Sequence, residues 1–203
     1  MRRSVLLLVS GALAVLLASG VALAATINCV AGEVFCVGTK NDDTLNGSEE
    51  REELYGLGGI DQLFGNGGDD EFFGGKEADT IRGGSGYDRT GASGEEDAGA
   101  DRIYGEADVD NLIDMSVHRD RRGRVAADKN LVDGGPRNDY LGGGSRLYGG
   151  DGNDELRGYS SIRTKRPVRI LDGGSGEDTI SSSGGDREGL HPRRRARHNL
   201  LRQ

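Results

Sequence analysis

Two nine-residue segments decide the fold, Gly149-Gly-Asp-Gly-Asn-Asp-Glu-Leu-Arg157 and Gly173-Gly-Ser-Gly-Glu-Asp-Thr-Ile-Ser181. Both follow the pattern G-G-x-G-x-D-x-U-x, in which U is a large apolar residue, at every specified position. Four related blocks run without a gap from Gly56 to Gly91, and their aspartates stand nine residues apart at Asp61, Asp70, Asp79 and Asp88. Self-similarity at this period predicts a solenoid built from short, stacked repeats.

Weaker copies extend the array and retain the second half of the pattern better than the first. They are residues 38–46 with Asp43, 47–55 with Glu52 in place of the aspartate, 96–104 with Asp101, 105–113 with Asp110, and 134–142 with Asp139.

Each part of the repeat has a physical reason. Glycine allows the tight turns and close backbone approach that the first half of the block requires. The three residues after the aspartate alternate polar, apolar, polar, which predicts a short strand with one inward side chain. The chain has 4 Phe, 6 Tyr and no Trp, so we expect a narrow row of apolar side chains rather than a broad core. The expected row, in which Thr90 is a weak position, is Leu45, Leu54, Leu63, Phe72, Ile81, Ile103, Leu112, Leu141, Leu156 and Ile180.

The pattern resembles the hemolysin-type (RTX) calcium-binding repeat over most of residues 38–181. The resemblance implies an all-β fold, a right-handed parallel β-roll (β-helix) solenoid in which two blocks make one coil and calcium ions lie between turns. One edge is expected to stack Asp43, Asp61 and Asp79, and the other Glu52, Asp70 and Asp88. The carboxylates expected to bind several Ca²⁺ ions belong to Asp43, Asp61, Asp70, Asp79, Asp88, Asp101, Asp110, Asp139, Asp154 and Asp178. The backbone carbonyls expected to join them belong to Gly56, Gly58, Gly65, Gly67, Gly74, Gly83, Gly149 and Gly173.

The charge distribution is consistent with calcium as the partner. Residues 38–113 contain 20 acidic and 6 basic residues, and the whole chain has a formal net charge of −8, which argues against a nucleic-acid partner. Stacked carboxylates repel one another, so we expect calcium to drive folding and the calcium-free chain to be largely disordered. The alternative is an acidic coil that never folds. Residues 114–181 contain 11 acidic and 12 basic residues, and we expect them to bind fewer ions.

The N-terminus predicts export. Residues 1–24 combine a basic start, an apolar run and the small-x-small sequence Ala22-Leu23-Ala24, which is typical of a cleaved signal peptide. A retained membrane anchor is the alternative. Cys29 and Cys36 lie in the following segment, 25–37, and an exported chain favours a disulfide between them over two free thiols. We therefore expect a secreted, extracellular protein with no membrane partner after signal cleavage.

The remaining boundaries follow breaks in the repeat. Residues 38–113 form an acidic array, 114–124 a basic insertion, and 125–181 a mixture of degenerate and good repeats with Asn130 at one aspartate position. A second basic insertion interrupts this part at 158–169. Residues 182–203 form a basic tail that we expect to be disordered.

No catalytic motif is found. The chain has neither the H-E-x-x-H of zinc proteases nor the G-x-S-x-G of serine hydrolases. The sequence therefore predicts a non-enzymatic calcium-binding protein. Two alternatives are a calcium-stabilised surface adhesin or extracellular matrix component, which binds cell-envelope polymers or other extracellular proteins, and a small hydrolase of unrecognised type.

Overall fold

The computed structural model describes residues 23–91, 99–114, 130–143, 146–159 and 170–183, and these residues contain strands and turns but no helix. No membrane-spanning helix is therefore found within these ranges. The expected signal peptide, most of both basic insertions and nearly all of the basic tail lie outside them. The strands are β1 (Thr26–Asn28), β2 (Phe35–Val37), β3 (Thr44–Asn46), β4 (Glu53–Leu57), β5 (Gln62–Gly67), β6 (Glu71–Gly75), β7 (Thr80–Ser85), β8 (Arg89–Thr90), β9 (Arg102–Ala107), β10 (Asn111–Ile113), β11 (Leu131–Pro136), β12 (Tyr140–Gly143), β13 (Arg146–Asp151), β14 (Glu155–Tyr159), β15 (Ile170–Ser175) and β16 (Thr179–Ser183).

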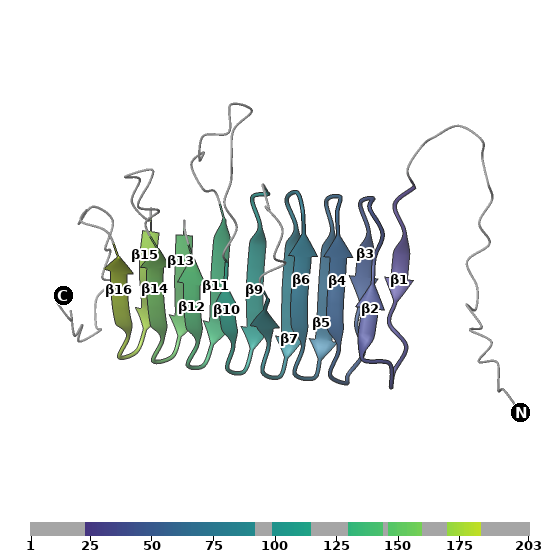
Figure 1. Ribbon diagram of the computed structural model, residues 1–203. Coiled ribbons are helices and arrows are strands. Elements are labelled where there is room, and N and C mark those ends of the chain that lie inside the picture. The colour runs from purple at the N-terminus through teal and green to yellow at the C-terminus, as the bar shows by residue number, and fades with distance from the viewer. Residues whose placement is uncertain (1–22, 92–98, 115–129, 144–145, 160–169, 184–203) are drawn as a thin grey trace, which may run out of the picture.

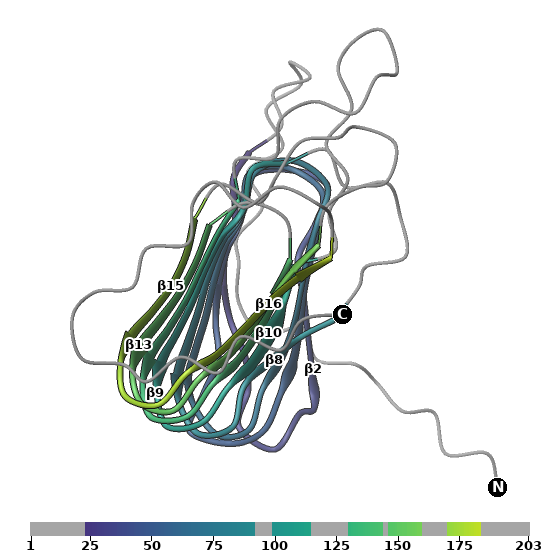
Figure 2. The ribbon, with the colours of Figure 1, turned by 90° about the vertical axis from the view of Figure 1, so that its left-hand side faces the viewer.

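The strands form two parallel sheets of eight. Odd-numbered strands make sheet A, in the order β1-β3-β5-β7-β9-β11-β13-β15, and even-numbered strands make sheet B in the corresponding order. The chain crosses from one sheet to the other after every strand, so that the coils stack along one axis (Figure 1). Seen along that axis, the two sheets are the long walls of a flattened tube and the turns close its ends (Figure 2). This confirms the predicted all-β parallel solenoid.

The pairing register keeps equivalent repeat positions side by side. Leu45 pairs with Leu63, Leu63 with Ile81, and Ile81 with Ile103. The first two pairs are separated by 18 residues, but later coils differ in length, and residues in neighbouring coils are 22, 29, 15 or 24 apart. The register survives because the changes in coil length lie between the strands that carry the ladder of hydrogen bonds.

One narrow row of inward side chains, supplied alternately by sheet A and sheet B, fills the tube. Nine of the ten predicted positions are buried, and Ile180 is partly buried against the row. Val132, Leu147 and Leu171 extend the row through the second half of the chain, and Cys36 extends it at the N-terminal end. Sequence reasoning missed these four because the blocks around them have lost most of their glycines or follow an insertion.

Thr90 occupies the inward position of β8. Its hydroxyl accepts a 2.8 Å hydrogen bond from the Ile113 amide and donates one of 3.0 Å to the Ile113 carbonyl. The hydroxyl thus replaces part of the ladder between β8 and β10, where only Arg89 and Asn111 pair directly. This explains a polar residue at a position that is apolar in the neighbouring coils.

The solenoid begins earlier than the repeats indicate. Strand β1 pairs with β3 and β2 pairs with β4, so residues 26–37 form a first coil, although the sequence suggested a segment preceding the array. Each of these strands has three residues and one inward side chain, Ile27 or Cys36, which is enough to continue the row without a complete repeat. A disulfide joins Cys29 to Cys36 across this coil.

Candidate metal sites

The turns at the two ends of the tube carry two columns of polar residues, each placed directly before a strand. The turns that lead into sheet A form edge 1, with Asp43, Asp61, Asp79, Asp101 and Asn130. The turns that lead into sheet B form edge 2, with Glu52, Asp70, Asp88, Asp110, Asp139, Asp154 and Asp178. Every residue in both columns is buried, with at most 7% of its surface exposed. All ten predicted carboxylates therefore lie in one column or the other, and the two predicted stacks are present.

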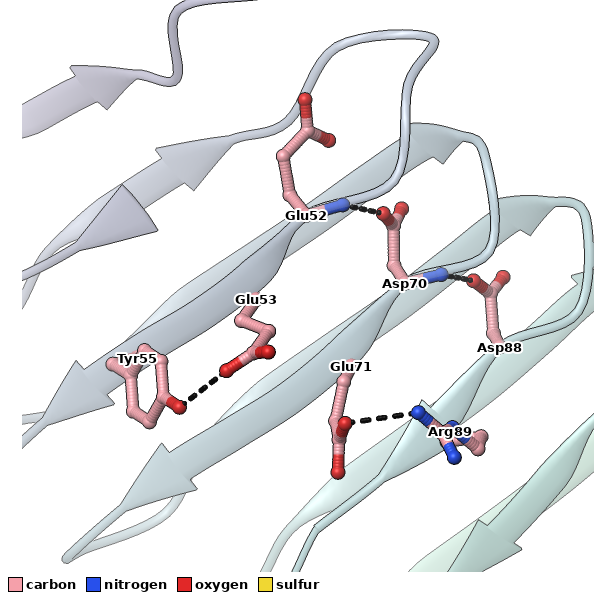
Figure 3. Close-up of polar contacts among 7 residues, drawn as sticks. All are labelled: Glu52, Glu53, Tyr55, Asp70, Glu71, Asp88 and Arg89. Atoms are coloured by element: carbon pink, nitrogen blue, oxygen red, sulfur yellow. Dashed lines mark hydrogen bonds and ion pairs between the residues drawn. The ribbon is translucent and has the colours of Figure 1, made fainter. Parts of the chain in front are cut away.

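A repeated hydrogen bond links each column. On edge 2 the Glu52 amide donates to Asp70 Oδ1 at 2.8 Å and the Asp70 amide donates to Asp88 Oδ1 at 3.0 Å (Figure 3). On edge 1 the Asp61 amide donates to Asp79 Oδ1 at 2.8 Å. The side-chain oxygen of Asn130 accepts the same bond from the Asp101 amide, at 3.1 Å. In each of these bonds, one side-chain oxygen ties its coil to the preceding one.

The second carboxylate oxygen has a different environment. In seven of the aspartates, Oδ2 is buried and no hydrogen bond reaches it: Asp61, Asp70, Asp88, Asp110, Asp139, Asp154 and Asp178. A buried, unsatisfied carboxylate oxygen is costly, and the cost rises when carboxylates lie one above another. Within the described residues, such a row requires either protons or cations.

The pKa values express the same cost. Burial, reinforced by the nearby carboxylates of Asp88 and Glu52, raises the pKa of Asp70 to about 7. Burial raises the pKa of Asp110 to about 8, and neighbouring Asp88 and Asp139 add to the effect. The pKa of Asp61 is raised to about 6 for the same reason, although a hydrogen bond from the Asp43 amide opposes the shift. Without a cation, these three carboxyl groups would therefore bind protons at a higher pH than ordinary aspartates do.

A glycine five residues before each aspartate makes room for these oxygens. A Cβ on Gly65 would lie less than 3.0 Å from both Asp70 Oδ2 and the Gly83 carbonyl oxygen of the next coil. On five more glycines, a Cβ would likewise lie less than 3.0 Å from one aspartate Oδ2 and one glycine carbonyl oxygen. They are Gly56, Gly83, Gly105, Gly134 and Gly149. The missing side chain thus leaves a space bordered by one carboxylate and one carbonyl oxygen from adjacent coils.

This donor set fits calcium. Among the residues that the structure describes, no three side chains of Asp, Glu, His or Cys converge on one point, so carboxylates alone do not make a site. Calcium prefers six to eight hard oxygen ligands and readily takes backbone carbonyls together with carboxylates. The residues that would hold it are the seven aspartates with a buried Oδ2 and the glycines whose carbonyls face them. Bound calcium would supply positive charge to a row of buried negative oxygens.

The predicted carbonyls are only partly those that border these spaces. The carbonyl oxygens of Gly74, Gly83, Gly149 and Gly173 do, whereas those of Gly56 and Gly65 lie beside Gly38 and Gly47, in the turns that precede Asp43 and Glu52. Gly58 and Gly67 have the carboxylates of Glu77 and Glu49 nearest to them instead. Sequence reasoning missed Gly105 and Gly134, whose carbonyls also border a space. Their position five residues before Asp110 and Asp139 was the available signal.

The comparison with known families agrees with this geometry. Four segments of the chain, residues 55–89, 97–113, 140–161 and 170–187, match the model of the RTX calcium-binding nonapeptide repeat. No curated protein matches the chain. The matched segments contain most of both carboxylate columns. The chain therefore carries calcium-binding repeats of the RTX nonapeptide family.

Proposed function

We propose that this chain is an exported, non-enzymatic protein whose solenoid folds when calcium ions bind between successive turns of both edges. One observation carries the proposal: buried Oδ2 atoms without hydrogen-bond partners face glycine carbonyls of the adjacent coil. The proposed ligands are the seven aspartates with an open Oδ2, with glycine carbonyls completing their sites. Asp79 and Asp101 are added to the proposed ligands because they occupy the same column position on edge 1.

Coupling between calcium and folding follows from the energetics of the columns. In the unfolded chain each aspartate is hydrated and distant from the others, whereas folding buries the aspartates in two rows. A cation that binds only the folded arrangement contributes its binding free energy to folding. The hydrophobic contribution is modest because each described strand supplies at most one buried apolar side chain.

Export is supported by two features. The disulfide between Cys29 and Cys36 is of the kind that persists in oxidising compartments, and the first 24 residues resemble a signal peptide. Outside the cell calcium is also abundant enough to occupy sites of modest affinity. A non-enzymatic role is supported because, among the described residues, every buried carboxylate except Asp114 lies at a repeat position, where column formation accounts for it.

Far-UV circular dichroism of the exported chain, which we expect to begin at Ala25, tests the proposal. We expect a cooperative coil-to-β transition on titration with calcium and none with magnesium at equal ionic strength, because Mg²⁺ demands a smaller octahedral shell and gives up water reluctantly. A spectrum unchanged by millimolar calcium would contradict calcium-driven folding.

A further inference from the structure

The first carboxylate of each edge is satisfied by the protein itself. Asp43 Oδ2 accepts hydrogen bonds from the Thr39 amide at 2.6 Å and the Thr39 hydroxyl at 2.7 Å, and its Oδ1 accepts one from the Ala25 amide at 2.9 Å. On the other edge, Glu52 accepts bonds from the Ser48 amide, at 3.1 Å, and from the Ser48 hydroxyl. Both carboxylates are buried, yet neither has an oxygen without a partner.

The two turns share one local motif. The Thr39 hydroxyl accepts a 3.1 Å bond from the Asn41 amide, and the Ser48 hydroxyl accepts a bond of the same length from the Glu50 amide. Each hydroxyl therefore closes a small turn and donates to the acidic residue four positions after it. The same arrangement at both edges, with Thr and Asp in one and Ser and Glu in the other, shows that the motif does not depend on one side-chain length.

The later turns are built differently at the same position. The residue directly after the first glycine of the turn has a left-handed φ, whether it is glycine or not: Leu57, Asn66, Gly75, Gly84, Glu106, Gly135, Gly150 and Gly174. Thr39 and Ser48 are not among the described residues with positive φ. Three of the eight are not glycine, and they hold a conformation that L-residues rarely adopt. The later turns contain this left-handed residue, and seven of the aspartates that follow them have no hydrogen bond to Oδ2. The first two turns instead place the hydroxyl of Thr39 or Ser48 beside the carboxylate.

The same region carries the covalent restraint. The disulfide from Cys29 to Cys36 closes a loop of the first coil, and Cys36 is buried in the apolar row beside Leu54. A short closed loop reduces the entropy of the unfolded segment and thereby stabilises the coil. We propose that residues 25–55 form an N-terminal cap that keeps its structure without calcium and provides the template on which the calcium-dependent coils assemble.

This proposal rests on calcium-driven folding of the rest of the chain. It gives acidic residues at the same position of the repeat two different roles, as part of the cap or as calcium ligands. Asp43 and Glu52 are cap residues whose negative charge is balanced by hydrogen bonds. The first carboxylates with an open, buried Oδ2 are Asp61 on edge 1 and Asp70 on edge 2. The cap also presents both carboxylate columns at the correct spacing, because the amides of Asp43 and Glu52 donate to Asp61 and Asp70.

Hydrogen–deuterium exchange of the exported, oxidised chain, compared in calcium and in a calcium chelator, tests the cap. We expect amides of residues 26–55 to remain protected in chelator and those of residues 62–183 to lose protection by at least about a hundredfold. Loss of protection in both regions on removing calcium would overturn the cap while leaving calcium-driven folding intact. No change in either region would overturn calcium-driven folding instead.

The variant T39V/S48A tests the hydroxyl motif directly. We expect protection of residues 26–55 in chelator to fall by about tenfold or more, because two buried carboxylates lose a donor. In saturating calcium, protection of residues 62–183 should persist. The control is T44V, which changes a threonine in the same coil at an outward position of β3. Equal loss in T44V, or unchanged protection in T39V/S48A, would overturn the role assigned to the hydroxyls.

Discussion

The Asp70 amide donates a 3.0 Å hydrogen bond to Oδ1 of Asp88, one coil away, while Oδ2 of each of these aspartates is buried without a hydrogen bond. Each such aspartate therefore has two roles. Its Oδ1 holds its coil to the preceding one, and its Oδ2 faces the space between adjacent coils. Because this relationship repeats along edge 2 to Asp178, the sites of an edge are mechanically coupled. We therefore expect calcium to bind cooperatively along an edge.

Removing one carboxylate charge should weaken the calcium response. We expect Asp70→Asn to raise the calcium concentration at the midpoint of the β transition by about ten- to a hundredfold, since a hydrogen bond or ligand contact of a buried charged group contributes about 1.5–3 kcal/mol. The neighbouring Asp69 is exposed, and its Oδ1 accepts a bond from the Tyr87 amide that an asparagine oxygen can also accept. Asp69→Asn is therefore the matched control and should move the midpoint by less than about twofold. Equal shifts for the two variants, measured by circular dichroism, would remove Asp70 from the proposed ligands.

Filling a glycine space should have the same effect without any change in charge. We expect Gly65→Ala to abolish the calcium transition or move it above about 10 mM, because its Cβ would press on Asp70 Oδ2 and the Gly83 carbonyl. Gly58 offers the comparison, because a Cβ there would meet Glu77 Oε2 at 3.7 Å as its nearest neighbour, an ordinary contact. Gly58→Ala should keep the wild-type titration curve. A normal transition in Gly65→Ala would show that the space is not a calcium site.

The raised pKa values predict opposite pH responses with and without calcium. The pKa is about 6 for Asp61, about 7 for Asp70 and Asp154, and about 8 for Asp110 in the calcium-free solenoid, against about 3.9 in an unfolded chain. The folded state therefore binds more protons, and the stability that they supply is complete below pH 4 and is lost as pH rises through 6 to 8.

We accordingly expect the calcium-free chain to have more β structure at pH 5 than at pH 8 by circular dichroism. Protons and calcium compete for the same oxygens, so the calcium midpoint should rise as pH falls from 8 to 5. A calcium-free chain that is more ordered at pH 8 would contradict burial of these carboxylates.

Thr90, the polar residue in the apolar row, tests whether its hydrogen bonds to Ile113 stabilise the solenoid. We expect Thr90→Val to lower stability although it adds an apolar group, because the Ile113 amide and carbonyl lose their partner at a cost of about 1–3 kcal/mol. In saturating calcium this should lower Tm by about 2–4 °C for each kcal/mol. Thr80→Val, at an outward position of β7, is the control and should change Tm little. A higher Tm for Thr90→Val would show that apolar burial dominates at this position.

Much of the architecture was accessible from the sequence because the repeat is short and each block has one inward residue. The phase of Leu45, Leu63 and Ile81 was enough to predict their pairing, since a period of 18 residues per coil leaves one register. Val132 and Leu147 were missed because pairing with neighbours, rather than a complete local motif, places them in the row. The first coil was missed for the same reason, as β1 and β2 are defined by the strands they join.

The sequence by itself determined the two carboxylate columns, because a side chain that recurs at one phase of a regular coil must stack on its equivalents. It could not distinguish carboxylates that the protein satisfies from those it leaves open. Asp43 and Asp61 occupy the same repeat position, but Asp43 meets a hydroxyl and two amides whereas Asp61 Oδ2 meets none. That difference depends on the backbone conformation at Thr39 and Leu57 and on atoms supplied by another coil. Only the folded chain brings these groups within hydrogen-bonding distance, so only the tertiary structure decided which carboxylates are left for a cation.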